Sequence, residues 1–337
     1  MIVVRAPLRI SFMGGGTDLP DFYRQYKGKV LSMAINQYVY VVINKTPLIN
    51  KLSARYSQSE TVDHPKDFSH SRIREALLDL GIEKNIEIGS FASLPAKTGL
   101  GSSSSFSVAL LKGLHTYLGN KLDAAEIARL ACRLEIDLVG EPIGKQDQYA
   151  AAMGGMNVLT FHPDETVDVE PVLLSYTARH ALEDHLLIFY TGITRNASSV
   201  LTEQKANTQN NFATLKELSD SVDICKEYIV NAEFKKLGEL LHQSWVKKKQ
   251  LSSNISNGLI DNLYGAGLEG GAWGGKVLGA GGGGCIMFIA APDKKEDIRA
   301  RIQEVARNND LHDLCEIRPH LVYSGVETLY HLDKNIY

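Results

Sequence analysis

The chain has 337 residues, of which 44% are hydrophobic, and this is enough to bury a large core and to form two domains. Its formal net charge of −3 provides no electrostatic attraction for nucleic acid or for an anionic membrane surface. Because it shows no secretory signal, no long apolar run and no CxxC spacing among its four cysteines, we expect a cytoplasmic protein with reduced thiols.

The chain begins with a predicted strand over residues 2–13, in which apolar and mixed faces alternate. Leu8, Ile10 and Phe12 share one face, and Arg9, Ser11 and Met13 share the other. Three glycines then force a turn before Thr17 and Asp18. Two interpretations stay open at this stage. Arg9 and Asp18 line a cleft, or they are an edge-strand arginine and the aspartate of a turn.

A second strand is predicted within residues 30–47, because Val39, Val41 and Ile43 share one face. Apolar spacing predicts a helix over residues 66–80, and a strand over 86–91 follows it. The polar segment 56–67 is the one we expect to border a base pocket.

A glycine-rich turn runs directly into a helix between Leu94 and Tyr117. Gly99 and Gly101 allow tight backbone turns, and serines follow them. Phe106, Leu110, Leu114 and Tyr117 form a stripe of helical period. The serines therefore fall in the first helical turn, where free N–H groups and the helix dipole favour an anion. The alternative is a flexible Gly/Ser linker. A Walker loop is excluded, because no lysine follows a GxxxxG pair.

A helix is predicted from Asp123, which has Glu126 at the spacing of a capping box, to the Gly140 region. Glu135 lies on the margin of its apolar stripe, as a rim charge or as a metal ligand. Asp137 and Glu141 are the nearby alternatives. The segment 144–148 that follows is interpreted as a polar loop.

Strands are predicted over residues 156–161 and 167–174, and the chain changes domain near 175–184. A strand over 185–190 and polar helices within 197–251 follow, and the lysines at 247–249 are interpreted as a solvated helix face. The GxGxxG pattern that begins at Gly279 precedes a strand, so it predicts a hairpin and not a dinucleotide site. A helix over 293–308 and strands near Glu316 and Leu321 complete an α+β pattern.

Three segments are more specific together than alone: RAPLRISFMGGGTD, LPAKTGLGSSSSFSVAL and GGKVLGAGGGGCIMF. In this order and spacing the chain resembles the GHMP kinases, the family of galactokinase, homoserine kinase and mevalonate kinase. The GGGTD segment makes it most similar to the D-glycero-D-manno-heptose 7-phosphate kinases of that family.

The resemblance implies an α+β, two-domain GHMP kinase fold. Residues 1–178 would form an N-terminal domain similar to ribosomal protein S5 domain 2. Residues 179–337 would form a ferredoxin-like C-terminal domain, with ATP between the two.

The resemblance also implies the nucleotide and metal contacts. The residues that would bind ATP are Lys97, Gly99, Leu100, Gly101, Ser102, Ser103 and Ser104. Ser103 and Glu135 would ligate Mg²⁺. The third motif, with Gly279, Gly281, Gly282 and Gly283, would brace the phosphate loop.

For the acceptor sugar, the resemblance implies Asp147 as the catalytic aspartate and Arg9 as its neighbour. Asp18 matches the sugar-binding aspartate, and Thr17 lies beside it. Gly15 and Gly16 stand where galactokinase has a glutamate and a histidine, so we expect room there for a longer, phosphorylated sugar. The predicted partners of that phosphate are Arg195, Lys97 and Arg72, with no means of choosing among them.

The resulting hypothesis is an ATP-dependent kinase that phosphorylates the anomeric hydroxyl of a heptose 7-phosphate for surface glycan synthesis. Its partners would be small molecules only, with neither nucleic acid nor membrane, and the oligomeric state stays open. The alternatives are a kinase of an unphosphorylated sugar such as fucose, and a non-catalytic sugar and ATP sensor. Retention of Arg9, Ser103, Glu135 and Asp147 together favours a catalyst over a sensor.

Overall fold

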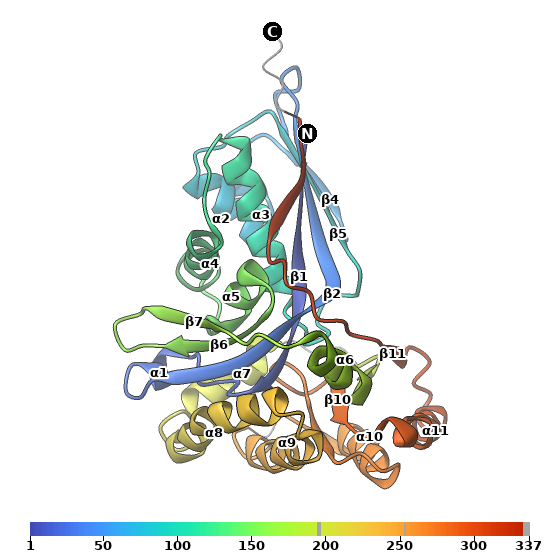
Figure 1. Cartoon of the computed structure of the whole chain (residues 1–337). Helices are drawn as coiled ribbons and strands as arrows, with labels where there is room; N and C mark the ends of the chain where they lie inside the picture. The colour runs from blue at the N-terminus through green and yellow to red at the C-terminus, as the bar shows by residue number, and fades with distance from the viewer. Residues whose placement is uncertain (194–196, 253, 333–337) are drawn as a thin grey trace.

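The computed structural model describes residues 1–193, 197–252 and 254–332, and Arg195 lies outside these ranges. Figure 1 shows two sheets at different heights, each with its own helices. β1 and β2 of the first sheet are long strands, and they contact α8, a helix of the part that carries the second sheet. No helix in the described ranges combines the length and the apolar character needed to cross a membrane.

The first sheet has eight strands, with the order β12-β1-β2-β5-β3-β4; β6 pairs with β2 off this path, and β7 pairs with β6. Its strands are β1 (Ile2–Met13), β2 (Gly28–Lys45), β3 (Leu52–Arg55), β4 (Ser59–Val62), β5 (Ile86–Ala92), β6 (Met156–Phe161), β7 (Val167–Pro171) and β12 (Glu327–His331). β2 pairs with β5 along its second half and with β6 along its first half. The predicted strands over 2–13, 30–47, 86–91, 156–161 and 167–174 are confirmed, with small shifts at their ends.

The helices of this part lie mainly on one side of the sheet (Figure 1). They are α1 (Pro20–Tyr23), α2 (Ser71–Asp79), α3 (Ser102–Tyr117), α4 (Ala124–Cys132) and α5 (Gln146–Met153), with a 3₁₀ turn at Pro65–Asp67 and a π-helical segment at Arg133–Leu138. α3 packs across β1 and β2. Leu110 and Leu114 of the predicted stripe are fully buried, and burying one such side chain stabilises the fold by about 1.5–3 kcal/mol.

The second sheet has the strand order β11-β8-β10-β9, and all its pairs are antiparallel. Its strands are β8 (Leu186–Tyr190), β9 (Gly274–Val277), β10 (Cys285–Ile289) and β11 (Cys315–Ile317). The helices are α6 (Tyr176–His185), α7 (Ala197–Ala206), α8 (Phe212–Val230), α9 (Phe234–Lys248), α10 (Gly258–Glu269) and α11 (Lys295–Asn308), with a 3₁₀ turn at Pro292–Lys294. In chain order the strands lie fourth, first, third and second, which is the ferredoxin-like arrangement predicted for this part.

The C-terminal end of the chain returns to the first sheet. β12 pairs antiparallel with β1, and in Figure 1 this red strand runs beside the N-terminus. The strand predicted near Leu321 is only a single bridge to Ile35 of β2. The first sheet therefore takes an edge strand, residues 327–331, from the end of the chain. The division near residue 178, which falls within α6, stays a prediction.

Candidate active site

The turn before α3 has the geometry expected of an anion site. Gly99 and Gly101 have φ angles of 79° and 77°, which glycine adopts without strain. Gly101 is the residue that caps α3, and no side chain accepts a hydrogen bond at this cap. Ser102, Ser103 and Ser104 follow it in the first turn and line a cavity. Their backbone N–H groups and the helix dipole would stabilise phosphate oxygens there.

The third motif packs directly on this turn. A Cβ on Gly99 would lie 2.5 Å from the carbonyl oxygen of Leu278, and one on Gly279 would lie 2.8 Å from the Cα of Gly99. The two backbones touch, and both glycines have positive φ angles, so larger residues do not fit. The β9–β10 hairpin, which the sequence predicted, therefore holds the phosphate turn from the other domain.

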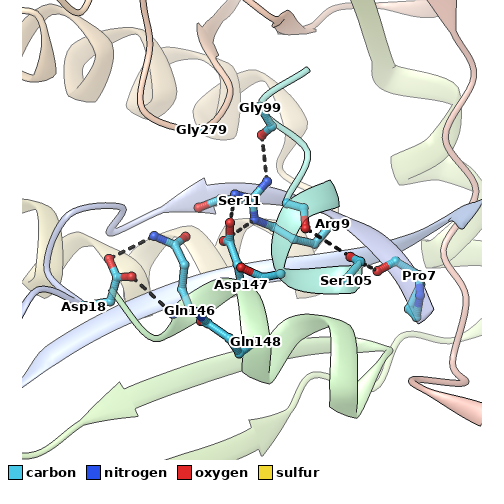
Figure 2. Close-up of polar contacts among 12 residues, drawn as sticks. Pro7, Arg9, Ser11, Asp18, Gly99, Ser105, Gln146, Asp147, Gln148 and Gly279 are labelled. Atoms are coloured by element: carbon cyan, nitrogen blue, oxygen red, sulfur yellow. Dashed lines mark hydrogen bonds and ion pairs between the residues drawn. The ribbon is translucent and has the colours of Figure 1, made fainter. Parts of the chain in front are cut away.

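Arg9 and Asp147, which both line the cavity, form a bidentate ion pair (Figure 2). The Arg9 Nε donates to Oδ1 of Asp147 at 2.7 Å, and Nη2 donates to Oδ2 at 2.8 Å. Nη1 donates to the carbonyl oxygen of Gly99 at 2.7 Å. Arg9 is only 4% exposed, so this fork is fixed between the phosphate turn and the aspartate. The two residues that the sequence analysis paired are thus brought together from β1 and α5.

Asp147 lies in the first turn of α5. The prediction of a polar loop over 144–148 was therefore wrong from Gln146 onward. The pattern was misleading because the polar residues that begin this helix, Gln146 to Gln148, precede a run of alanines with little amphipathic contrast. This position places the Asp147 carboxylate at the start of the helix, where it pairs with Arg9 of β1.

Asp18 is held by the start of the same helix. Its Oδ1 accepts from the side-chain amide of Gln146 at 2.9 Å, and its Oδ2 accepts from the backbone N–H of Gln146 at 3.2 Å (Figure 2). The backbone N–H of Gly16 donates to Oδ1 at 3.1 Å. Burial is the main cause of a raised pKa at Asp18, and the negative charge of Asp147 adds to it. A Cβ on Gly144 would lie 2.0 Å from Oδ2 of Asp18, so this carboxylate needs a glycine beside it.

Two predicted site residues, Thr17 and Leu100, do not line the cavity but support its backbone. The hydroxyl of Thr17 donates to the carbonyl oxygens of Gly14 and Lys29, both at 2.8 Å, and thereby closes the glycine turn. Leu100 is fully buried, and its carbonyl oxygen accepts from the backbone N–H of Arg9 at 2.9 Å. Both residues hold the backbone that carries the site.

Glu135 lies on the π-helical segment that follows α4, whose predicted capping box between Asp123 and Glu126 is confirmed. A π turn shifts the helical register, and such turns are frequent at functional sites. Glu135 is 0% exposed, whereas Asp137 is exposed. Burial therefore distinguishes Glu135 from the exposed Asp137 as the candidate metal ligand. The apolar periodicity of the sequence could not choose between these two residues.

The carboxylate of Glu135 has four donors around it. Arg72 Nε and the Ser107 hydroxyl donate to Oε1, at 2.9 and 2.7 Å. The Ser104 hydroxyl donates to Oε2 at 2.8 Å, and the Gln148 amide donates to the same oxygen. Ser104, and not Ser103, is therefore the serine of the first turn that contacts Glu135 in the structure.

The cavity has a volume of about 350 Å³ and lies between the two domains. Its lining includes Arg9, Gly15, Gly16, Asp18, Arg72, Lys97, Gly99, Gly101, Ser102, Ser103, Ser104, Asp147 and Gly279. Most of the predicted site thus gathers around one space of the size that small ligands occupy. Arg72, one of the predicted phosphate partners, is already paired with Glu135 and Glu141.

The sequence analysis missed two buried lysines on this cavity. Lys248 is 7% exposed, so its interpretation as part of a solvated helix face was wrong, although Lys247 and Lys249 are partly exposed. Lys276 on β9 is 6% exposed. A signal was present for Lys248, since Leu241 and Trp245 precede it at the spacing of one buried helix face.

Family models and known proteins match both parts of the chain. The family model described as GHMP kinases N terminal domain matches residues 69–155, and the one described as GHMP kinases C terminal matches residues 225–308. A D-glycero-alpha-D-manno-heptose 7-phosphate kinase of Campylobacter jejuni is 29% identical over 88% of this chain and 91% of its own length. A galactokinase of Pyrococcus furiosus is 27% identical over 88% of this chain and 91% of its own.

One solved structure resembles this chain along its whole length. The D-glycero-D-manno-heptose 1-phosphate kinase from Bacteroides thetaiotaomicron superposes with a TM-score of 0.79 at 25% identity, over 99% of this chain and 100% of that one. The likeness therefore covers both domains of the chain.

Proposed function

Because the chain belongs to the GHMP kinase family and is an ATP-dependent sugar kinase, we propose that it phosphorylates the C1 hydroxyl of D-glycero-D-manno-heptose 7-phosphate. The product would be heptose 1,7-bisphosphate, an intermediate toward activated heptose for surface glycans. The observation that supports catalysis most is the Arg9–Asp147 fork, which lies between the anion-binding turn and the sugar side of the cavity.

The reaction follows from these two side chains. The C1 hydroxyl oxygen bonds to the γ-phosphorus of ATP, the bond from that phosphorus to the bridging oxygen breaks, and ADP leaves with the electron pair. Asp147 accepts the hydroxyl proton and orients the oxygen. Arg9 and the first turn of α3 offset the negative charge on the transferring group. Phosphoryl transfer depends mostly on such positioning and charge compensation.

The hydroxyl and carboxylate oxygens around the first turn of α3 are ligand types that Mg²⁺ binds. Mg²⁺ binds through one or two protein oxygens together with phosphates. Ser103 lines the cavity, and the buried Glu135 carboxylate is linked to the same helical turn through the Ser104 hydroxyl. Within the described residues no group of three or more His, Cys, Asp or Glu side chains could hold a metal, so a site dominated by protein ligands is not formed there. When bound with ATP, the ion would neutralise phosphate charge.

Glu135→Gln is expected to raise the Mg²⁺ concentration needed for half-maximal activity by about tenfold, because one negative charge is lost beside the phosphate turn. The measurement is the initial rate as a function of free Mg²⁺ at saturating ATP. Asp137→Asn is the matched control, since it removes an exposed carboxylate from the same segment. An unchanged magnesium titration in Glu135→Gln would assign the ion to another group such as Glu141.

The choice of a phosphorylated sugar rests on the glycine turn and on the heptose kinase relative. Gly15 and Gly16 line the cavity and bring no side chains to it, which leaves room beyond Asp18 for a longer acceptor. The relatedness to a galactokinase favours a second candidate, a kinase of an unphosphorylated sugar. A sensor without catalysis would have no use for a carboxylate at Asp147.

The test is an ADP-release assay with Mg-ATP and one sugar at a time. The sugars are D-glycero-D-manno-heptose 7-phosphate, the free heptose, fucose, mannose and galactose. We expect turnover with the 7-phosphate to exceed the others by at least about tenfold in kcat/KM. A preference for a free sugar would replace the proposed substrate, and ATP binding without any turnover would revive the sensor.

A further inference from the structure

Lys248 and Lys276 come from different elements and line one part of the cavity. Lys248 ends α9, and its Nζ donates to the carbonyl oxygen of Gly279 at 2.8 Å. Lys276 belongs to β9, and its Nζ donates to the carbonyl oxygens of Ser11 and Phe12 at 2.9 and 3.2 Å. The Lys276 contacts place its ammonium group at the end of β1, and the Nζ of Lys248 lies beside Gly15, a cavity residue just beyond that strand.

These two buried lysines form no ion pair with a carboxylate within the described ranges, although the charge of the nearby Asp18 favours the ammonium form of Lys248. Neither lysine takes part in an ion pair among the described residues, and the nearby Arg9 is committed to Asp147. Burial lowers the pKa of Lys248 to about 8 and lowers the pKa of Lys276 well below its ordinary value. The charges of Lys248 and Arg9 lower the pKa of Lys276 further. A desolvated group of like charges is costly unless an anion binds to it.

A third donor at the same place is unused. The hydroxyl of Ser11 is buried and has no hydrogen-bond partner among the described residues. A Cβ on Gly15 would lie 3.8 Å from the Nζ of Lys248 and 3.8 Å from the Oγ of Ser11. The two groups therefore converge on the space that this glycine leaves open. An unpaired buried hydroxyl is uncommon in folded proteins, which points to a missing ligand.

We propose that Lys248, Lys276 and Ser11 form the subsite for the terminal phosphate of the acceptor sugar. This inference rests on the proposed function, since it assigns the phosphate of that substrate. The acceptor is favoured over ATP because Lys248 lies beside Gly15 and close enough to Asp18, on the sugar side, to interact with its charge. The triphosphate has its own donors in the turn from Gly99 to Ser104. The subsite replaces Lys97, Arg72 and Arg195 as the partners of that phosphate.

The discriminating experiment measures kcat/KM for heptose 7-phosphate and for the free heptose, in the wild type and in Lys248→Met and Lys276→Met. Each variant is expected to reduce the preference for the phosphorylated sugar by about 10- to 100-fold, the usual effect of one charged hydrogen bond. The change should appear in the KM of the sugar phosphate and not in the KM of ATP. Lys247→Met is the control, because that neighbour is exposed and paired with Glu217.

The possible outcomes separate this inference from the proposed function. If the wild type prefers the 7-phosphate and both variants keep that preference, the subsite is wrong and the substrate stands. An increase in the KM of ATP instead would assign the lysines to the donor and also overturn the subsite. If the wild type uses both heptoses equally, the proposed substrate fails and the subsite fails with it.

A thermal unfolding experiment shows whether Lys248→Met is folded. It also tests whether the charge of Lys248 lacks a counterion when no ligand is bound. The charged groups around Lys248 are Arg9, Lys276 and Asp18. Its pKa is about 8 in the folded chain, and the ordinary pKa of a lysine, which the unfolded chain has, is 10.5. Below pH 8 the lysine is charged in both states, so the full desolvation cost is present. Between the two values the unfolded chain binds more protons, so wild-type stability rises with pH.

Without ligand, Lys248→Met is therefore expected to melt several degrees higher than the wild type below pH 8, with a gap that narrows toward pH 10.5. Heptose 7-phosphate should raise the melting temperature of the wild type much more than that of the variant. A variant that melts lower at about pH 7, or gains equally from the sugar phosphate, would contradict the assignment.

Discussion

Asp147→Asn is expected to lower kcat by about 10²- to 10⁴-fold while Mg-ATP still binds. Asparagine keeps the shape of the side chain, but it cannot accept the proton of the acceptor hydroxyl. It also removes the charge that the Arg9 fork holds at 2.7 and 2.8 Å. The measurement is single-turnover phosphoryl transfer together with calorimetric titration of ATP. Asp184→Asn is the control, since it changes an exposed aspartate far from the cavity lining.

Two results would count against this role. Near-normal turnover in Asp147→Asn would remove the carboxylate from the mechanism. Loss of ATP binding in step with the loss of turnover would make Asp147 a part of the nucleotide site. A reduced kcat with unchanged ATP affinity is what positioning and proton acceptance predict.

Arg9→Met is expected to lower kcat by about 10²- to 10³-fold, the effect of losing one donor that stabilises transition-state charge. Methionine keeps much of the buried volume of a side chain that is only 4% exposed. The change leaves Asp147 without its partner and frees the carbonyl oxygen of Gly99. The phosphate turn therefore loses one of its links to β1.

Arg5→Met is the matched control for this prediction. Arg5 lies on the same strand as Arg9, but it is partly exposed and pairs with Glu327 of β12. Steady-state kinetics should show a change in kcat for Arg9→Met only. A variant that keeps kcat and raises only the KM of ATP would show that Arg9 binds the donor without acting in the transfer step.

The sequence predicted the elements whose pattern is local. Alternation identified β1, and the apolar stripe identified α3, because each element buries one face that its own residues define. The capping box at Asp123 and the glycine hairpin after Val277 were also confirmed, since each depends on a few neighbouring residues. The resemblance then supplied the Arg9–Asp147 pair, which no periodicity could connect across the intervening chain.

Features that depend on distant partners were not visible in the sequence. Lys248 appeared to be one of three surface lysines. Its spacing from Leu241 and Trp245 fits the buried face of α9, but the packing of that face against β9 is what places a lysine inside. Glu135 turns inward on a π-helical segment, where a regular helix would have kept it at the margin. β12 was missed because its residues are mostly exposed, and only the edge of β1 defines it as a strand.

The structure of the reaction product tests most directly whether the protein phosphorylates the C1 hydroxyl of the sugar phosphate. The enzyme, Mg-ATP and D-glycero-D-manno-heptose 7-phosphate are incubated, and the product is analysed by phosphorus–proton correlation NMR. The account predicts one sugar product with a second phosphate that couples to the anomeric proton, formed in equal amount to ADP. A phosphate on another carbon, or ADP and free phosphate without a new sugar phosphate, would contradict it.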